Sequence, residues 1–317
     1  MVGQSNSVPA SAAVWLHRFA MATAAATFCL IIAGALVVGN EAGLAVPDWP
    51  LSYGTWMPPM EGGIFYEHGH RMVATFVGFL TTVLVIWLWL REPRKWVRWL
   101  GAASLLAVIA QGVLGGITVL YFLPTAVSVT HACLAQAFFC LTLSLAVFTS
   151  PAWNRAREFV ASEQEDEDRP YRFWHWSGAT AAAIFVQLAL GAALRHKGLG
   201  LAPHLAWAGV VSVLMYWLVL RGARNLQSHK RLRGLLFTLG SLLIVQLGLG
   251  IASSLIRMVT RDAPQPTLPV VWITTAHVAA GALLLGGTWV LTLLAYRALR
   301  TPQNDFGHSR SSGEVWV

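Results

Sequence analysis

The chain has 317 residues, of which 56% are hydrophobic and only 11% are charged, and its mean hydropathy is +0.58. A soluble domain carries roughly twice that charged fraction, so the composition excludes an ordinary soluble protein. The formal net charge of +8 would suit a nucleic-acid-binding protein. However, the basic residues lie in short segments between apolar stretches, which makes them topology signals rather than a nucleic-acid patch.

Eight apolar stretches of about 20 residues follow one another along the chain, and each is long enough to cross a bilayer as a helix. The first stretch is too long for the apolar region of a signal peptide, so we expect it to stay in the protein as a helix. The predicted fold is all-α and integral to the membrane, with spans at about 14–38, 69–90, 97–120, 126–149, 174–194, 204–221, 234–256 and 271–297.

The basic residues divide unevenly between the two sides of the membrane. If the eight spans alternate in direction, 17 of the 22 basic residues fall on the side that holds both termini. The other side holds Arg71, Arg195, Lys197, Arg257 and Arg261. Because positive charge is retained on the cytoplasmic side, we expect both termini to be cytoplasmic.

The chain also repeats itself. An acidic run, 162–168, separates four spans from four, and an even number of helices in each half predicts two tandem four-helix bundles in parallel orientation. The expected organisation is an N-terminal bundle at 1–160, a cytoplasmic linker at 161–172, a C-terminal bundle at 173–300 and a polar tail at 301–317.

Related strings recur in the third, fifth and seventh spans. Each begins with a glutamine and ends four residues later with a glycine, in the pairs Gln111 and Gly115, Gln187 and Gly191, and Gln246 and Gly250. Such glycines let helices, or a flat macrocycle, approach closely, and we favour tight helix packing as their role.

Four histidines, His70, His131, His204 and His277, lie near the starts of spans that run from the outer to the inner side. Neutral imidazole is a strong ligand for haem iron, and two imidazoles from facing helices can clamp one haem. The alternative for any one of them is a packed histidine that is hydrogen-bonded to a neighbouring helix. Four at matching positions favour two haem sites, with His70 facing His131 and His204 facing His277.

The other histidines are expected to be ordinary interfacial or solvated residues, with His68 kept open because it lies close to the first site; they are His17, His68, His175, His196, His229 and His308.

Glu67 lies three residues before His70 and shares a helix face with it if the helix has begun. An ionisable group inside a membrane span is a functional candidate. It could act as an acid or base beside a bound macrocycle or orient His70, or it could be a simple helix-start charge. Arg71 is a candidate anchor for a haem propionate, with a plain interfacial anchor as the alternative.

With these residues the chain resembles the haem A synthase family of cytochrome oxidase assembly. The resemblance spans all eight apolar stretches and rests on the string Gly43-Leu44-Ala45-Val46-Pro47-Asp48-Trp49-Pro50, on Glu67-x-x-His70-Arg71, and on the three later histidines. Many bacterial relatives carry a cysteine pair in the first external loop. This chain has none at 39–67.

The resemblance implies that His204 and His277 hold a permanent haem b, that His70 and His131 bracket haem O as substrate, and that Glu67 is the catalytic carboxylate. The implied reaction oxidises a ring methyl of haem O to a formyl group by successive hydroxylations with water as the oxygen source. The implied location is a bacterial inner membrane. A membrane electron acceptor such as a quinone, haem O synthase and a second copy of the chain are candidate partners.

Two other classes of protein share parts of this pattern. A di-haem b electron carrier needs the same four histidines but has less use for Glu67. A transporter or haem-handling chaperone also uses two helical repeats, but it is expected to have broken helices and a polar path through both leaflets.

Overall fold

The computed structural model describes residues 10–151, 153 and 173–299. The predicted linker at 161–172 and tail at 301–317 lie outside these residues. The described helices are α1 (Ala10–Gly39), α2 (Gly62–Arg91), α3 (Lys95–Leu120), α4 (Thr125–Thr149), α6 (Phe173–Arg195), α7 (Leu201–Asn225), α8 (Lys230–Val259) and α9 (Leu268–Leu299).

All eight described helices are long and apolar enough to cross a membrane, which confirms the predicted all-α, eight-span fold. Most boundaries lie within a few residues of the expected ones, but α2 begins at Gly62 rather than near residue 69. The apolar pattern misses these first two turns because their polar side chains are bound by the preceding loop instead of by water. His70 therefore lies in the third turn of α2, deeper than expected.

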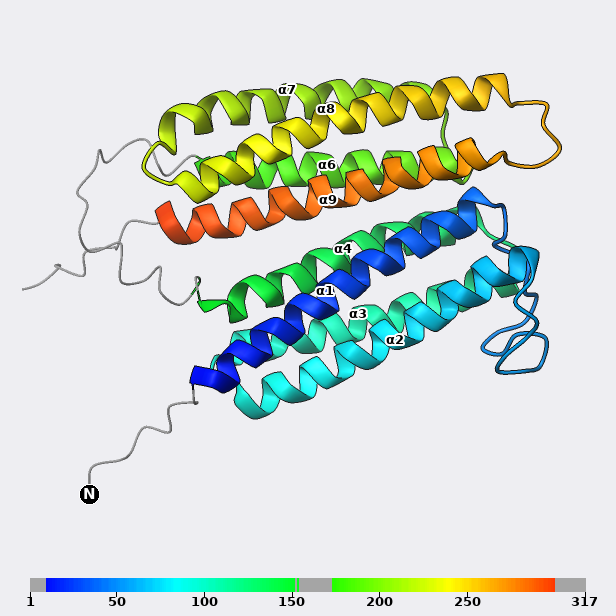
Figure 1. The fold of residues 1–317 in the computed structure, drawn as a ribbon, viewed down its shortest axis with the longest axis horizontal. Helices are drawn as coiled ribbons and strands as arrows, with labels where there is room; N and C mark the ends of the chain where they lie inside the picture. Colours follow the sequence, from blue (N-terminus) through cyan, green and yellow to red (C-terminus); the bar gives the residue numbers. More distant parts are fainter. Residues whose placement is uncertain (1–9, 152, 154–172, 300–317) are drawn as a thin grey trace, which may run out of the picture.

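Helices α1–α4 contact one another, as do α6–α9, so that the molecule consists of two neighbouring groups of four helices (Figure 1). Each group has a core of its own. Leu84, Leu88 and Leu145 are among the fully buried side chains of the first group, and Met215 and Leu218 are among those of the second. Below, the two groups are named the first bundle and the second bundle.

The two bundles meet along α1, α4, α6 and α9. Ile31, Phe139 and Ala282 form a separate buried cluster between them, and the Trp289 indole N–H donates to Ser144 Oγ at 2.8 Å across the junction. Helix α9 is the most enclosed of the eight, whereas α7 and α8 expose long apolar faces of the kind that lipid covers.

Because the helices alternate in direction, α2, α4, α7 and α9 all begin at one end of the molecule (Figure 1). This end also carries the connection 40–61 between α1 and α2, and we call it the loop end. All four predicted ligand histidines lie toward it. Each described helix runs unbroken over its range, which gives no support to the broken-helix transporter.

Candidate haem sites

Each of the four predicted histidines lies against a glycine of the helix that precedes its own. A Cβ atom built on the glycine would lie 3.0–3.4 Å from the imidazole Cε1, in the pairs Gly34 with His70, Gly115 with His131, Gly191 with His204, and Gly250 with His277. At Gly34, Gly191 and Gly250 a Cβ would force the imidazole to shift by a few tenths of an ångström, whereas the 3.4 Å at Gly115 is close to ordinary van der Waals contact. Each of the three string glycines faces an imidazole of the following helix, and their expected role in close helix packing stays a prediction.

In the second bundle, the rings of His204 and His277 face each other with their centroids 6.4 Å apart and their planes at 70°. An imidazole nitrogen binds a transition metal at about 2 Å, so two rings on opposite sides of one iron have centroids roughly 6 Å apart. The observed separation fits that arrangement. The structure thus brings this predicted ligand pair together.

Two of the string glutamines reach the same rings. Gln187 Nε2 lies 3.2 Å from Nδ1 and 3.3 Å from Nε2 of His204 and donates to the His204 carbonyl at 3.0 Å. Gln246 Nε2 lies 3.5 Å from His277 Nε2. The amides therefore line the second ring pair, a role that the sequence strings did not reveal.

Several buried polar atoms around the four histidines have no hydrogen-bond partner among the described residues: Nδ1 of His70, His131 and His277, and Oε1 of Gln111, Gln187 and Gln246. Buried polar atoms without partners are rare in folded proteins and mark places where a ligand or ion belongs. Together with the ring geometry, these atoms fit a haem-binding site in each bundle.

The first bundle differs in how its histidines face each other. His70 and His131 make no ring-to-ring contact in the described part of the chain, although they are close enough to interact electrostatically. Glu67 lies one turn away on α2 and is 4% exposed. It is the only acidic residue in the eight described helices.

Both oxygens of the Glu67 carboxylate are bound. Oε1 pairs with Arg71 Nη2 at 2.6 Å, and Oε2 accepts a hydrogen bond from the Val46 backbone N–H at 2.8 Å. Neither oxygen bonds to His70, so the carboxylate is not the group that orients this imidazole. Glu67 therefore forms a buried ion pair with Arg71 at the edge of the first site.

Arg71 ties this ion pair to the loop. Its Nη1 donates to the carbonyls of Asp48 and Leu51 at 2.8 and 2.9 Å, and its Nη2 lies 3.3 Å from the Val46 carbonyl. The Arg71 guanidinium thus donates to acceptors within the protein. Its predicted role as an anchor for a haem propionate stays a prediction.

The loop 40–61 folds over the first bundle as a fixed cover. The Asp48 carboxylate accepts backbone hydrogen bonds from Tyr53 at 2.6 Å and Gly54 at 2.8 Å, where the chain turns with φ of +53° and +71°. These hydrogen bonds, that of Gly54 foremost, hold the pKa of Asp48 below its ordinary value. The Trp49 ring lies directly on Gly116 of α3.

The loop also reaches His68. Ser52 Oγ lies 2.8 Å from His68 Nδ1, and both side chains are buried. His68 is therefore part of the contact between the loop and α2, rather than a solvated residue.

Three other histidines bond or stack with residues outside the two sites. His17 hydrogen-bonds to the Ala146 carbonyl at 3.0 Å, His229 contacts Ser228, and His175 stacks on Trp174. His308 lies outside the described residues.

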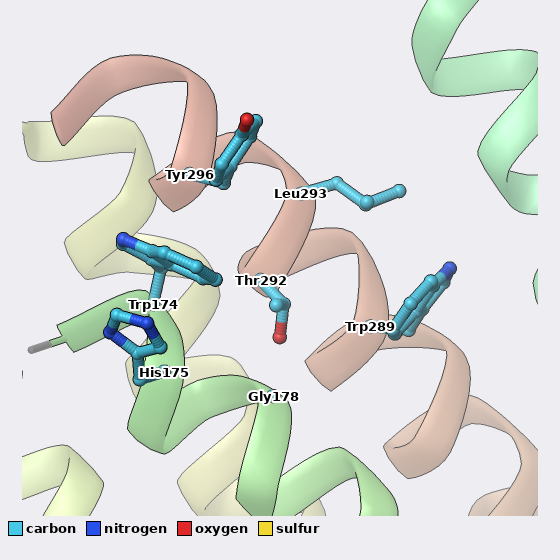
Figure 2. A pocket seen from close by; sticks show the side chains of 7 residues that line it. All are labelled: Trp174, His175, Gly178, Trp289, Thr292, Leu293 and Tyr296. Atoms are coloured by element: carbon cyan, nitrogen blue, oxygen red, sulfur yellow. The ribbon is translucent and has the colours of Figure 1, made fainter. Parts of the chain in front are cut away.

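A cavity of about 360 Å³ lies between α6 and α9, far from the loop end (Figure 2). Its lining is aromatic and apolar and includes Trp174, Trp289 and Tyr296. It contains no facing pair of imidazoles and does not match the four-histidine geometry.

A profile of the cytochrome oxidase assembly protein family (COX15-CtaA) matches residues 60–203, which include Glu67, His70 and His131. The heme A synthase of Geobacillus kaustophilus is 26% identical over 93% of this chain and 96% of its own length. Over residues 60–203 the chain is therefore similar to the COX15-CtaA family, and this stretch includes the Glu-x-x-His-Arg string.

Two further alignments are partial. The heme A synthase of Symbiobacterium thermophilum is 26% identical over 59% of this chain and 61% of its own length. That of Roseobacter denitrificans is 37% identical over 37% of this chain and 34% of its own length. In these alignments the chain spans less than two thirds of its relatives.

Sequence reasoning did not find Gly34, because no glutamine precedes it by four residues; Leu30 is there instead. It also left Gln187 and Gln246 without a role. Their identical spacing to the glycines was visible, and it could have indicated a shared side-chain partner in the next helix.

Proposed function

We propose that this chain is a haem A synthase, an oxidoreductase that converts a ring methyl of haem O to a formyl group. The observation that carries the proposal is the buried Glu67 ion pair beside His70, because a simple haem carrier has no need for a charged carboxylate there. The near full-length relative that is named heme A synthase supports the same activity.

The two bundles would divide the work. In the proposed assignment, His204 and His277 hold a permanent haem b, and His70 and His131 bracket haem O. The close ring pair in the second bundle supports a fixed ligand set. The absence of such a contact between the described His70 and His131 suits a site that admits and releases a substrate. The matching histidine–glycine pairs support tandem bundles at 1–160 and 173–300.

The proposed reaction proceeds in two oxidations. In each, the methyl-derived carbon loses two electrons and gains the oxygen of a water molecule, with release of two protons. The first gives a hydroxymethyl group, and the second a diol that loses water to become the formyl group. A membrane electron acceptor of the quinone class would take the electrons, and haem b would supply one-electron transfer.

Glu67 has two parts in this chemistry. As a carboxylate paired with Arg71, it would stabilise positive charge that develops on the carbon under attack. A carboxylate offers about four lone-pair sites, so each oxygen can still accept a proton from the attacking water. Assistance of this kind is worth roughly 10²–10⁴-fold in rate.

We also propose an orientation and a setting. The loop end faces outward and both termini are cytoplasmic, which is supported by the 17 basic residues on the side of the termini. The setting is a bacterial inner membrane, with haem O synthase as the donor of substrate and a second copy of the chain as a further candidate partner.

A direct test is to express the chain with a haem O synthase in a host that lacks haem A, and to separate the extracted pigments by chromatography and mass spectrometry. Formyl haem, or its hydroxymethyl precursor, is expected. Haem B alone, in folded protein with haem O available, would overturn the proposal.

That second result would favour a di-haem b electron carrier. The observation on its side is that all four histidines rest on glycines in the same way, so both bundles could hold the same haem.

A further inference from the structure

One face of α6 carries a stripe of three residues, each four positions apart: Gln187, Gly191 and Arg195. Residues at this spacing lie above one another on a helix. Gln187 contacts His204, and Gly191 lies against the same imidazole. Arg195 continues the stripe by one turn toward the loop end.

The other three helices that support a histidine do not end this way. The residue four positions after the glycine is Val38 in α1, Val119 in α3 and Ser254 in α8. Only the stripe on α6 places a cation next to its haem site.

The Arg195 side chain turns into the junction between the bundles. Its Nη2 donates to the Ala35 carbonyl of α1 at 3.0 Å, while its Nε is buried without a hydrogen-bond partner. Thr275 of α9, two residues before His277, also has a buried hydroxyl without a partner. Arg195 Nη2 and Thr275 Oγ1 each lie 3.7 Å from the point that a Cβ on Gly39 would occupy. Both side chains therefore lie beside Gly39, at the junction of α1, α6 and α9.

No carboxylate pairs with Arg195 among the described residues. Glu67 is bound to Arg71, and the remaining helices have no acidic side chain. Burial, together with the Arg195 charge, lowers the pKa of the neighbouring His196. A largely enclosed cation without a counter-ion is costly, and Arg pairs best with a carboxylate.

We propose that Arg195 and Thr275 bind a propionate carboxylate of the haem held between His204 and His277. The inference rests on the proposed function, which places a haem there. The guanidinium also makes the site more positive, so it favours the reduced iron and raises the midpoint potential. Arg195 is then the residue that anchors the resident haem.

The test uses the full-length protein in detergent, reconstituted with haem b and, separately, with haem b dimethyl ester, which lacks both carboxylates. Four variants are compared with wild type: Arg195→Gln, Arg195→Lys, Thr275→Val and, as control, Arg261→Gln. Arg261 is an exposed cation at the same end of the molecule.

We expect Arg195→Gln to shift the midpoint potential to more negative values and to weaken haem retention by roughly tenfold or more. Arg195→Lys should leave the midpoint potential close to that of wild type. Thr275→Val should shift it in the same direction as Arg195→Gln, but by less. Wild type should bind the dimethyl ester more weakly than haem b, and Arg195→Gln should no longer distinguish the two.

A clamp that only joins α1 to α6 would leave the potential unchanged and the preference for haem b intact, and that result overturns the inference. Wild-type protein without any haem bound by two histidines would overturn the proposed resident site itself. The absorption spectrum separates these two failures.

Discussion

Both bundles support their histidines in the same way, but the residues around the histidines differ. Every histidine rests on a glycine of the preceding helix. In the second bundle the two rings face each other, and glutamine amides line them. In the first bundle a loop covers the site, and the only acidic residue of the described helices is buried beneath it. Under the proposed function, this shared scaffold would hold one ligand pair permanently and prepare the other for chemistry.

The loop 40–61 is the clearest difference between the two bundles. Arg71, Glu67 and the carbonyls of the loop form one connected set of hydrogen bonds, so the cover and the carboxylate are held together. A charge inside a membrane protein is stable only with such partners. The second bundle has no acidic helix residue, and its cation, Arg195, is free of a carboxylate in the described part of the chain.

The largest effect is expected from removal of a ligand in the second bundle. His277→Ala should abolish the resident haem and its two-histidine spectrum, because the loss of an axial ligand costs more than the roughly 10–100-fold that loss of an outer partner costs. Haem content per protein measures this. His229→Ala, at the opposite end of the molecule, serves as the control. Full haem content in His277→Ala would break the proposed division of roles.

A smaller effect is expected from the supporting glycines. Gly250→Ala places a Cβ 3.1 Å from His277 Cε1 and should weaken resident haem binding, since overpacking costs about 1–3 kcal/mol. Gly248→Ala is the matched control, because nothing lies within 4 Å of its Cβ position.

The same pair of changes can be made in the first bundle. Gly115→Ala should impair haem O conversion and leave the resident haem spectrum intact, whereas Gly112→Ala, which also has open space, should do neither. Equal behaviour of Gly250→Ala and Gly248→Ala would show that the contact with the imidazole is unimportant.

The smallest effect is expected from pH at the loop. The pKa of Asp48 is lowered by the Gly54 and Tyr53 N–H groups, so the folded loop binds its proton less tightly than the unfolded chain does. The resulting stability is present above the ordinary value of 3.8 and is lost as the pH falls through the lowered pKa. The protection factors for hydrogen exchange at residues 46–54, which correct for the pH dependence of intrinsic exchange, should therefore fall in acid.

Asp48→Asn should lower these protection factors at neutral pH and make them nearly independent of pH in acid, with Glu61→Gln as the control in the same loop. If Asp48→Asn matched wild type at both pH values, the carboxylate would not be what holds the turn.

The sequence was sufficient for the features that follow from local pattern. Apolar length predicted all eight spans, and the histidines near the starts of alternate spans predicted which end holds them. The early start of α2 was missed because the preceding loop stabilises its first turns. The hydrogen bond from the Val46 N–H to Glu67 joins residues 21 positions apart, which a local pattern does not reveal. The role of Gly34 was likewise hidden, since it depends on His70 of another helix.

The pairing of Glu67 with Arg71 was within reach of the i, i+4 rule, but the Val46 N–H and the loop carbonyls were not. Their positions depend on how 40–61 folds. For the same reason, the sequence indicated only that Arg195 is a charge near the membrane surface. The structure adds that it lies at the junction of α1, α6 and α9.

The most direct measurement is of the pigments bound to Glu67→Gln protein that is co-expressed with a haem O synthase. Glutamine keeps the size of the side chain and removes its charge. The account predicts bound haem O, an unaltered resident haem b spectrum, and formyl haem formation per bound haem O reduced by roughly 10²–10⁴-fold. Near-normal conversion of bound haem O by this variant would contradict the central role of Glu67.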